Sequence, residues 1–490
     1  MAGIVTLLCV SHRVRASVAY LQDSISAGYP IIHQFTTHSA AVANGSANII
    51  TSNVPKIPGR FTYIDPDTPQ DALTRQSYMD SSQTLKLVFS DEFNVDGRTF
   101  YPGDDPFWQA VDLHYWQTAD LEWYDPAAIT TKGGSLEITL SSKETHGGML
   151  QSWNMMCFTG GLIEASVMLP GAPDVQGLWP AMWMMGNLGR AGYGATTDGL
   201  WPYSYDSCDY GTLANQSLGD QPPGVFTPGQ GDPFAFDHLS FLPGQRLSRC
   251  TCSGESHPGP KDNNGEFVGR SAPEIDIFES QVSTLLLNRC SHSRYSPPIQ
   301  PMNDGYYWHN GSGSFEIYDV SKTAFNPYRG GAYQQAISGL THTNQSCYEL
   351  TGRCYAKFAI EYVPGIDPYI SWISNDQLSW TITETAFGAD SFVEIGPRPI
   401  AQEPMYLIMN LGMAPGFEQP SANLQFPAQL RVDYLRIYQP EGRENIGCDP
   451  SGFPTAKYIS QYNDAYSNPN YTSWAAAGQT FPKNKFAGQC

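Results

Sequence analysis

Short segments in which apolar residues alternate with polar or small ones recur along most of the chain. Such alternation predicts half-buried β-strands, because successive side chains of a strand point to opposite faces of a sheet. No long amphipathic helical repeat and no internal repeat stands out. The pattern therefore predicts a mostly β fold. The expected strands are 85–89, 136–140, 162–168, 272–279, 358–362, 369–373, 405–409 and 430–438.

The composition agrees with many short strands joined by turn-rich loops. The 490 residues include 46 Gly and 37 Pro, which helical bundles tolerate poorly, and 13% are aromatic. Hydrophobic residues make up 41%, so a buried core is expected. No apolar run reaches the ~18 residues of a membrane span. The formal charge of −20 argues against nucleic acid or an anionic membrane surface as the main partner.

Changes of composition along the chain predict its organisation. Residues 1–28 are expected to form an atypical N-terminal leader, and 29–82 a stem rich in Pro, Ser and Thr. One large catalytic β domain is expected over 83–440. A Gly- and Pro-rich insertion stapled by disulfides interrupts this domain at about 186–271. Residues 441–490 are expected to form a C-terminal extension that packs on the domain.

Ten cysteines and five Asn-x-Ser/Thr sequons favour an oxidising secretory compartment. About one or two sequons arise by chance in a long chain, so a cytosolic protein stays an alternative. Cys250 and Cys252 are too close to favour each other, so each is expected to pair elsewhere. No cysteine or histidine spacing is typical of a zinc site, and no metal or cofactor is predicted.

Three acidic residues on the predicted strand that ends at Glu279 are the most informative feature of the chain. Acidic residues are depleted in strands, and three on one short strand repel each other. Ile275 and Ile277 demand a buried face, so Glu274 and Asp276 must share the other. Strict alternation would turn Glu279 into the core. One extra residue near Ile277, a β-bulge, would return it to the face of the other two acids.

Carboxylates gathered on one face are able to carry retaining glycoside hydrolysis. That reaction needs two carboxyl groups about 5–5.5 Å apart, one to attack the anomeric carbon and one to protonate the leaving oxygen. We predict Glu274 as the nucleophile and Glu279 as the general acid/base. Asp276 would orient the nucleophile and raise the pKa of the acid by its charge. An acidic edge strand or a calcium site is the alternative, since this spacing arises by chance in ~5% of such chains.

Tryptophans form the second candidate feature. Trp179 and Trp183 lie four residues apart on a predicted strand and hence on one face. Trp153 is a third candidate. Because sugar rings stack their axial C–H faces on indole, exposed tryptophans are typical of glucan-binding surfaces. The alternative for each of them is an ordinary place in the core.

The acidic string Glu274–Glu279 and the tryptophan-bearing stretch Gly177–Met184 resemble the catalytic signature and a strand of glycoside hydrolase family 16. More specifically, the chain is similar to the branch of fungal β-glucan-synthesis-associated proteins. The similarity covers roughly residues 60–475. The other stretches that carry it are 64–69, 89–94, 120–126, 149–154, 157–161, 186–190, 201–209, 328–331, 405–412 and 445–450.

The resemblance implies a concanavalin-like β-jelly-roll sandwich of two curved antiparallel sheets with long rim loops, the concave sheet forming a glucan cleft. It implies the roles given above for the three acids, and it adds Asn410 to the expected substrate-binding residues. The implied function is that of a retaining β-glucan glycosidase or transglycosylase in fungal cell-wall β-1,6-glucan biosynthesis and remodelling. The alternative is a non-catalytic glucan-binding or assembly factor of the same fold.

Members of this branch resemble type II membrane proteins whose catalytic part faces the lumen of the secretory pathway. Residues 28–32 are similar to the segment that follows their membrane span, but no span is legible before them. We therefore expect the secretory lumen or the cell surface as the location, and a membrane only through an anchor that this sequence does not show. The expected partner is a β-glucan polysaccharide or oligosaccharide.

Overall fold

The computed structural model describes residues 62–142, 146–226, 239–283, 290–295, 298–299, 313–328 and 330–490. The predicted leader, 1–28, lies outside the described residues, as does most of the predicted stem, 29–82. The last part of that stem region, from residue 62, contributes strand β1 (Thr74–Gln76), which pairs with β2 (Thr84–Asp91).

Within the described residues, the strands form two ten-stranded sheets and one three-stranded sheet. All pairs in them are antiparallel except the short pair β5–β8. The first sheet holds β1, β2, β23 (Ala428–Pro440), β9 (Gly161–Met168), β19 (Ala356–Val363), β20 (Tyr369–Ser374), β21 (Gln377–Thr383) and β14 (Phe315–Ile317), with β7 (Leu136–Leu140) and β6 (Ile129–Thr131) beside β23. The second holds β15 (Thr323–Phe325), β18 (Gly339–His342), β12 (Cys290–Tyr295), β11 (Glu274–Ser283), β10 (Trp179–Gly186), β22 (Met405–Gly412), β8 (His146–Gln151), β5 (Trp123–Tyr124) and β4 (Leu113–His114), with β3 (Gln109–Ala110) beside β8. The small sheet holds β13 (Pro298–Ile299), β17 (Gln334–Ala336) and β16 (Gly330–Gly331).

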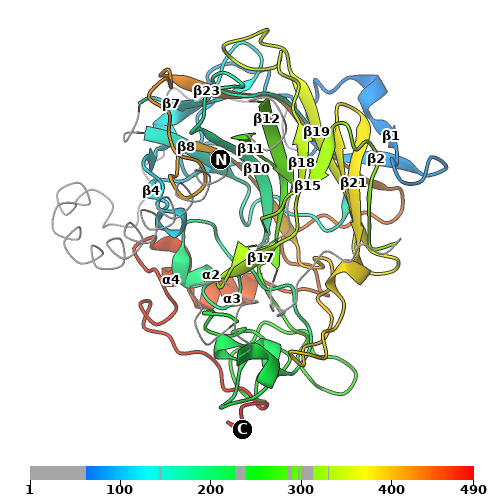
Figure 1. The fold of residues 1–490 in the computed structure, drawn as a ribbon, viewed down its shortest axis with the longest axis vertical. Helices are drawn as coiled ribbons and strands as arrows, with labels where there is room; N and C mark the ends of the chain where they lie inside the picture. The colour runs from blue at the N-terminus through cyan, green and yellow to red at the C-terminus, as the bar shows by residue number, and fades with distance from the viewer. Residues whose placement is uncertain are drawn as a thin grey trace, which may run out of the picture. The chain divides into compact units, whose positions relative to one another are not determined.

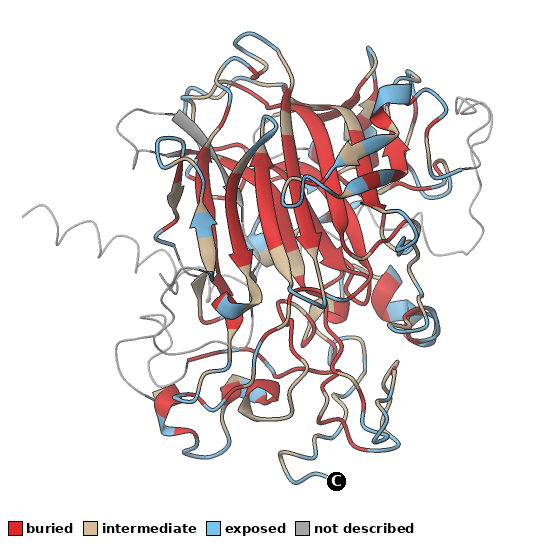
Figure 2. Ribbon diagram, turned by 90° about the vertical axis from the view of Figure 1, so that its right-hand side faces the viewer, coloured by how far each residue is buried: buried red, intermediate tan, exposed pale blue. Residues whose placement is uncertain are grey.

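A core of aliphatic and aromatic side chains lies between the two large sheets. It forms because alternate residues of the central strands point inward from both sides. Figure 2 shows these strands as almost wholly buried, with the exposed residues gathered in loops and turns. The predicted all-β jelly-roll sandwich is confirmed, and every predicted strand is found. The core includes Ile163, Val167, Phe358, Ile360, Leu435 and Ile437 from the first sheet and Met182, Met184, Ile275, Phe278, Leu407 and Met409 from the second.

A second core lies on the outer face of the second sheet, the face turned away from the first sheet. The predicted insertion and the C-terminal extension cover part of this face with their helices α2 (Gly194–Thr197), α3 (Ala456–Gln461) and α4 (Asn463–Ser467), which lie together in Figure 1. The second core joins Ala181, Trp183, Met185, Tyr406 and Ile408 of the sheet to Leu188, Tyr193, Leu200, Leu247, Tyr458, Tyr466 and Trp474.

Among the described residues, three disulfides hold these segments, Cys157–Cys448, Cys208–Cys250 and Cys252–Cys490, and a fourth, Cys347–Cys354, closes the loop before β19. Cys250 and Cys252 each pair elsewhere, as predicted. Four disulfides indicate an oxidising compartment, such as the secretory pathway or the cell exterior. Across the described ranges, no helix has the length and apolarity needed to traverse a bilayer. The same ranges contain no cluster of His, Cys, Asp and Glu side chains suited to a metal ion.

Candidate active site

The bulge predicted in the acidic strand is present. Strands β10 and β11 pair with Met182 opposite Phe278 and with Trp183 opposite Asp276. The adjacent residues of β10 thus face residues of β11 that are two apart, and Ile277 is the extra residue between them. A bulge of this kind reverses the alternation of side chains beyond it. The prediction of a bulge near Ile277 is confirmed.

The bulge brings the three acids to one face of the sheet. Glu279 pairs with Ala181, Asp276 with Trp183 and Glu274 with Met185. Side chains directly opposite in an antiparallel pair share a face, and alternate residues of β10 also share a face. All three carboxylates therefore lie on the outer face of the second sheet. The neighbours Ile275, Ile277 and Phe278 face the core between the sheets instead.

A tryptophan of the opposite sheet holds the backbone at the bulge. The indole N–H of Trp372, on β20, donates to the carbonyl oxygen of Asp276 at 2.8 Å. The ring of Trp372 is fully buried and stacks on Trp380 of β21, with 4.1 Å between the ring centroids. A donor from outside the ladder stabilises a carbonyl next to the unpaired residue of a bulge.

Each glutamate of the predicted catalytic pair accepts a hydrogen bond from an indole. Trp179 Nε1 donates to Glu279 Oε1 at 2.9 Å, and Trp201 Nε1 donates to Glu274 Oε2. Such bonds to a carboxylate fix its orientation. Trp201 belongs to the insertion and was not among the predicted site residues. The only signal for it in the sequence is its place in the family-like stretch 201–209.

Besides this hydrogen bond, Trp179 makes a contact between aromatic rings. Its ring lies parallel to that of Phe417, which follows β22, with centroids 4.1 Å apart. Both rings are partly exposed, so the pair offers an apolar surface next to Glu279. Trp179 therefore has a partly exposed ring and a hydrogen bond to Glu279, and its contact with sugar stays a prediction.

Trp183 and Asn410 lie on the same face but are buried, with 8% and 7% of their surface exposed. Trp183 Nε1 donates to Asn410 Oδ1 at 2.8 Å, and Asn410 Nδ2 donates to the hydroxyl of Tyr124 at 3.2 Å. Asn410 also lies in one cross-strand row with Ala181 and Glu279. These contacts lock the amide of Asn410 in a single orientation.

Trp153 is occupied by protein contacts in the second core. Its ring stacks on Tyr466 of α4, with centroids 5.6 Å apart, and the Arg190 guanidinium lies 4.4 Å from its centre. Its N–H donates to the carbonyl of Asn187 at 3.1 Å. The structure thus places Trp153 between the insertion and the C-terminal extension.

A pair of buried acids, Asp120 and Glu122, lies next to the hydrogen-bonded side chains of Asn410 and Tyr124. Burial raises the pKa of both carboxyls, and the charge of Asp120 raises that of Glu122 further, to about 9. Glu122 Oε2 accepts the N–H of Met413 at 2.9 Å, directly after β22. The pKa of the nearby Tyr115 hydroxyl is raised well above its usual value, mainly by burial. The negative charges of Glu274 and Asp120 raise it further. The negative charge of Asp120 thus opposes ionisation of the buried Glu122 carboxyl.

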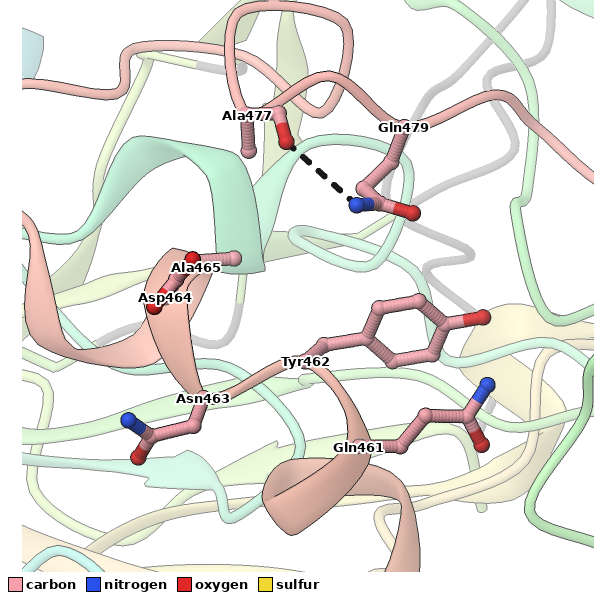
Figure 3. Close-up of a pocket in the computed structure, with 7 residues that line it drawn as sticks. All are labelled: Gln461, Tyr462, Asn463, Asp464, Ala465, Ala477 and Gln479. Atoms are coloured by element: carbon pink, nitrogen blue, oxygen red, sulfur yellow. Dashed lines mark hydrogen bonds between the residues drawn. The ribbon is translucent and has the colours of Figure 1, made fainter.

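Two pockets are lined by residues other than the three acids. One of about 180 Å³ lies in the C-terminal extension and is lined by Gln461, Tyr462, Asn463, Asp464, Ala465, Ala477 and Gln479; Figure 3 shows the Gln479 amide bonded to the Ala477 carbonyl at 3.4 Å. The other, of about 220 Å³, lies beside Pro273, where the acidic strand begins, between the insertion and the segment 397–403.

Comparison with known families now identifies the chain. Residues 16–490 match the model of the β-glucan synthesis-associated protein family SKN1/KRE6/Sbg1. The chain belongs to this family. Among its relatives, KRE6 of Saccharomyces cerevisiae is 44% identical over 442 residues, which are 88% of this chain and 57% of that protein. SKN1 of Candida albicans is 44% identical over 441 residues, 88% of this chain and 55% of that protein. The chain spans little more than half the length of these relatives.

Solved structures similar to this family member include glucanases. The catalytic domain of an endo-1,3-β-glucanase (laminarinase) from Thermotoga petrophila is 17% identical, with 74% of this chain and 100% of that chain covered and a TM-score of 0.38. A family 16 protein from Bacteroides ovatus, in complex with a glucan product, is 15% identical, with 72% and 100% covered and a TM-score of 0.40.

Proposed function

We propose that this protein is a retaining β-glucan-active enzyme, a glycosidase or transglycosylase that acts in fungal cell-wall β-1,6-glucan biosynthesis and remodelling. The observation that carries the proposal is the bulge at Ile277, which turns Glu279 to the face of Glu274 and Asp276. Membership of a β-glucan synthesis-associated family supports glucan as the substrate class. The four disulfides support action in the secretory lumen or at the cell surface.

In the proposed reaction, the Glu274 carboxylate attacks the anomeric carbon of a glucosyl unit. The bond from that carbon to the leaving oxygen breaks, and the carboxylic acid of Glu279 gives its proton to that oxygen. Glu279, now a carboxylate, takes a proton from water or from a sugar hydroxyl. The resulting nucleophile attacks the anomeric carbon and releases Glu274. Water gives hydrolysis, and a glucan hydroxyl gives transfer.

The indole bonds fit these roles. A hydrogen bond from Trp201 holds the nucleophile in one orientation, and the bond from Trp179 does the same for the acid/base. Asp276, only 2% exposed, lies between the two glutamates on the same face and would help to orient the nucleophile. Trp179 and Phe417 would stack on sugar rings, while the buried Trp183 would act through Asn410.

The test uses azide to report on each glutamate separately. Wild-type protein, E274A and E279A are incubated with a laminarin- or pustulan-type oligomer bearing a good leaving group, with and without sodium azide. We expect E279A to form the glycosyl-enzyme still and to give a β-glycosyl azide. E274A should give only the α-glycosyl azide, because azide enters from the side that the nucleophile vacates.

The products of wild-type protein on unmodified oligomers then separate transfer from hydrolysis. Longer chains with a new linkage indicate transfer, and shorter chains indicate hydrolysis. Glucan that is bound but unaltered by wild-type protein, together with no azide product from either variant, would favour the non-catalytic assembly factor and overturn the proposal.

A further inference from the structure

A buried carboxylate outside the acidic strand ties together the segments on either side of the site. Glu418 lies in the loop between β22 and β23 and is only 9% exposed. Its Oε2 accepts the backbone N–H of Gly177 at 2.7 Å, and its Oε1 accepts that of Val282 at 2.9 Å. One side chain thus bonds to the approach of β10 and to the far end of β11.

Both bonded backbone groups are near neighbours of the proposed acid/base unit. Gly177 precedes Trp179 by two residues, and Val282 follows Glu279 by three on β11. Trp179 donates to Glu279, and Phe417, next to Glu418 in the chain, stacks on Trp179. The carboxylate of Glu418 therefore holds the backbone close to Trp179 and close to Glu279, and Phe417 is its neighbour in the chain.

The fit around this carboxylate is close. The N–H groups of Phe417 and Glu418 both donate to the carbonyl of Ala414 at 3.0 Å, which folds the loop back on itself. A Cβ at Gly177 would come within 2.4 Å of the Pro420 Cα, and the φ of Gly177 is +116°. Only glycine fits such a contact at such a backbone angle, so the loop and the approach to β10 meet in a fixed register.

Burying a carboxyl group here has a cost that apolar packing would avoid. Burial raises the pKa of Glu418 to about 7, although the two backbone N–H bonds act in the opposite direction. A glutamine would keep one accepting oxygen but would turn an NH₂ group toward one of the two N–H donors. A carboxylate is the side chain of this size that accepts both bonds.

We propose that Glu418 is a positioning residue that sets the orientation of Trp179 toward Glu279. This role rests on the proposed function, since it matters for turnover only if Glu279 is the acid/base. It predicts that loss of one of the two bonds lets the segment 176–179 shift and misdirects the indole N–H.

The test compares E418Q with a matched control, E349Q. Glu349, in the Cys347–Cys354 loop, also accepts two backbone N–H groups, from Gly171 at 3.1 Å and from Gln429 at 2.9 Å, but both bond to its Oε2. A glutamine there removes the charge and keeps both bonds. One readout is the ¹H–¹⁵N indole resonance of Trp179, assigned with W179F. The other is the split of kcat and KM on a glucan oligomer with a natural sugar leaving group.

We expect E418Q to shift the Trp179 indole resonance and to lower kcat by about tenfold while KM changes less than about twofold. E349Q should leave both readouts at their wild-type values. E418D, which keeps the charge but shortens the side chain by one methylene so that it no longer reaches both N–H groups, should reproduce the shift and the loss of kcat, and it serves if E418Q does not fold.

An unmoved Trp179 resonance in a folded E418Q, or a kcat that matches that of E349Q, would overturn the role of Glu418. Failure of the proposed function looks different. In that case wild-type protein has no turnover, while the resonance still shifts in E418Q and stays in place in E349Q.

Discussion

The indole N–H of Trp372 donates to the backbone carbonyl of Asp276 across the two sheets of the sandwich, at 2.8 Å. Trp372 lies on β20 of the first sheet and Asp276 on β11 of the second, beside the bulged Ile277. The backbone that presents the three acids on the outer face is thus fixed from the opposite, inner side. The geometry of the site depends on a residue of the other sheet.

We therefore expect W372F to damage the site as well as the fold. The phenyl ring fills most of the indole volume but cannot donate to the Asp276 carbonyl, which costs about 1–3 kcal/mol of the free energy of unfolding. Glucan turnover should fall further than this modest destabilisation explains, because the bulge loses its outside donor. Urea unfolding and oligomer turnover measure the two effects.

The matched control for that substitution is W380F. It removes an indole N–H from the same stack but leaves the bond from Trp372 to Asp276 in place. Equal losses of turnover in W372F and W380F at equal stability would assign the effect to packing and not to the bulge.

The two indole bonds to the glutamates predict different kinetic defects. W179F and W201F each remove one bond to a carboxylate, worth about 1.5–3 kcal/mol, or roughly 10- to 100-fold in turnover. A leaving group that needs no protonation bypasses the acid. The defect of W179F should therefore shrink on an aryl glycoside, while that of W201F should persist. Identical dependence on the leaving group in both variants would contradict the assignment of Glu279 as acid and Glu274 as nucleophile.

The Asp120–Glu122 pair predicts an alkaline loss of stability. The pKa of Glu122 is raised in the folded state to about 9 from about 4.5, so the folded protein keeps a proton that the unfolded chain has released. Its contribution to stability is therefore full below about pH 4.5 and is lost as the pH rises toward 9. E122Q, whose amide oxygen still accepts from Met413, should flatten the decline of Tm between about pH 5 and 9.

An exposed glutamate provides the control for this pH series. Glu441 has 79% of its side chain exposed, opposite Lys86. The Tm of E441Q should follow the wild-type curve across the same pH range. A curve for E122Q that is parallel to the wild type would show that Glu122 is ionised in the folded protein.

The Cys252–Cys490 disulfide predicts how the C-terminal extension is held. It spans 238 residues and joins the insertion to the end of the described chain. C252S/C490S should lower the free energy of unfolding by about 2–4 kcal/mol. Hydrogen exchange should rise in the part of the extension around Trp474, whose backbone N–H donates to the Asp198 carboxylate at 2.8 Å. C347S/C354S, in a separate loop, should leave exchange around Trp474 at its wild-type level.

The sequence by itself determined the strands and the face of the acids, and its resemblance to a known family supplied the two-sheet sandwich. The alternation of apolar residues is a local property, so strands such as β7 (Leu136–Leu140) were found with their bounds unchanged. The bulge also followed from local chemistry. Ile275 and Ile277 need the core and three acids cannot enter it unpaired, which leaves one extra residue as the solution.

Only the tertiary structure decided which residues surround those acids. Trp201 reaches Glu274 from 73 positions away, Trp372 reaches Asp276 from 96 and Glu418 reaches Val282 from 136. The tertiary structure also packed Trp183 and Trp153 into the second core, although both were candidates for an exposed sugar-binding surface. A side chain's hydrogen-bond partners depend on how distant segments pack, and no periodicity within one strand encodes that.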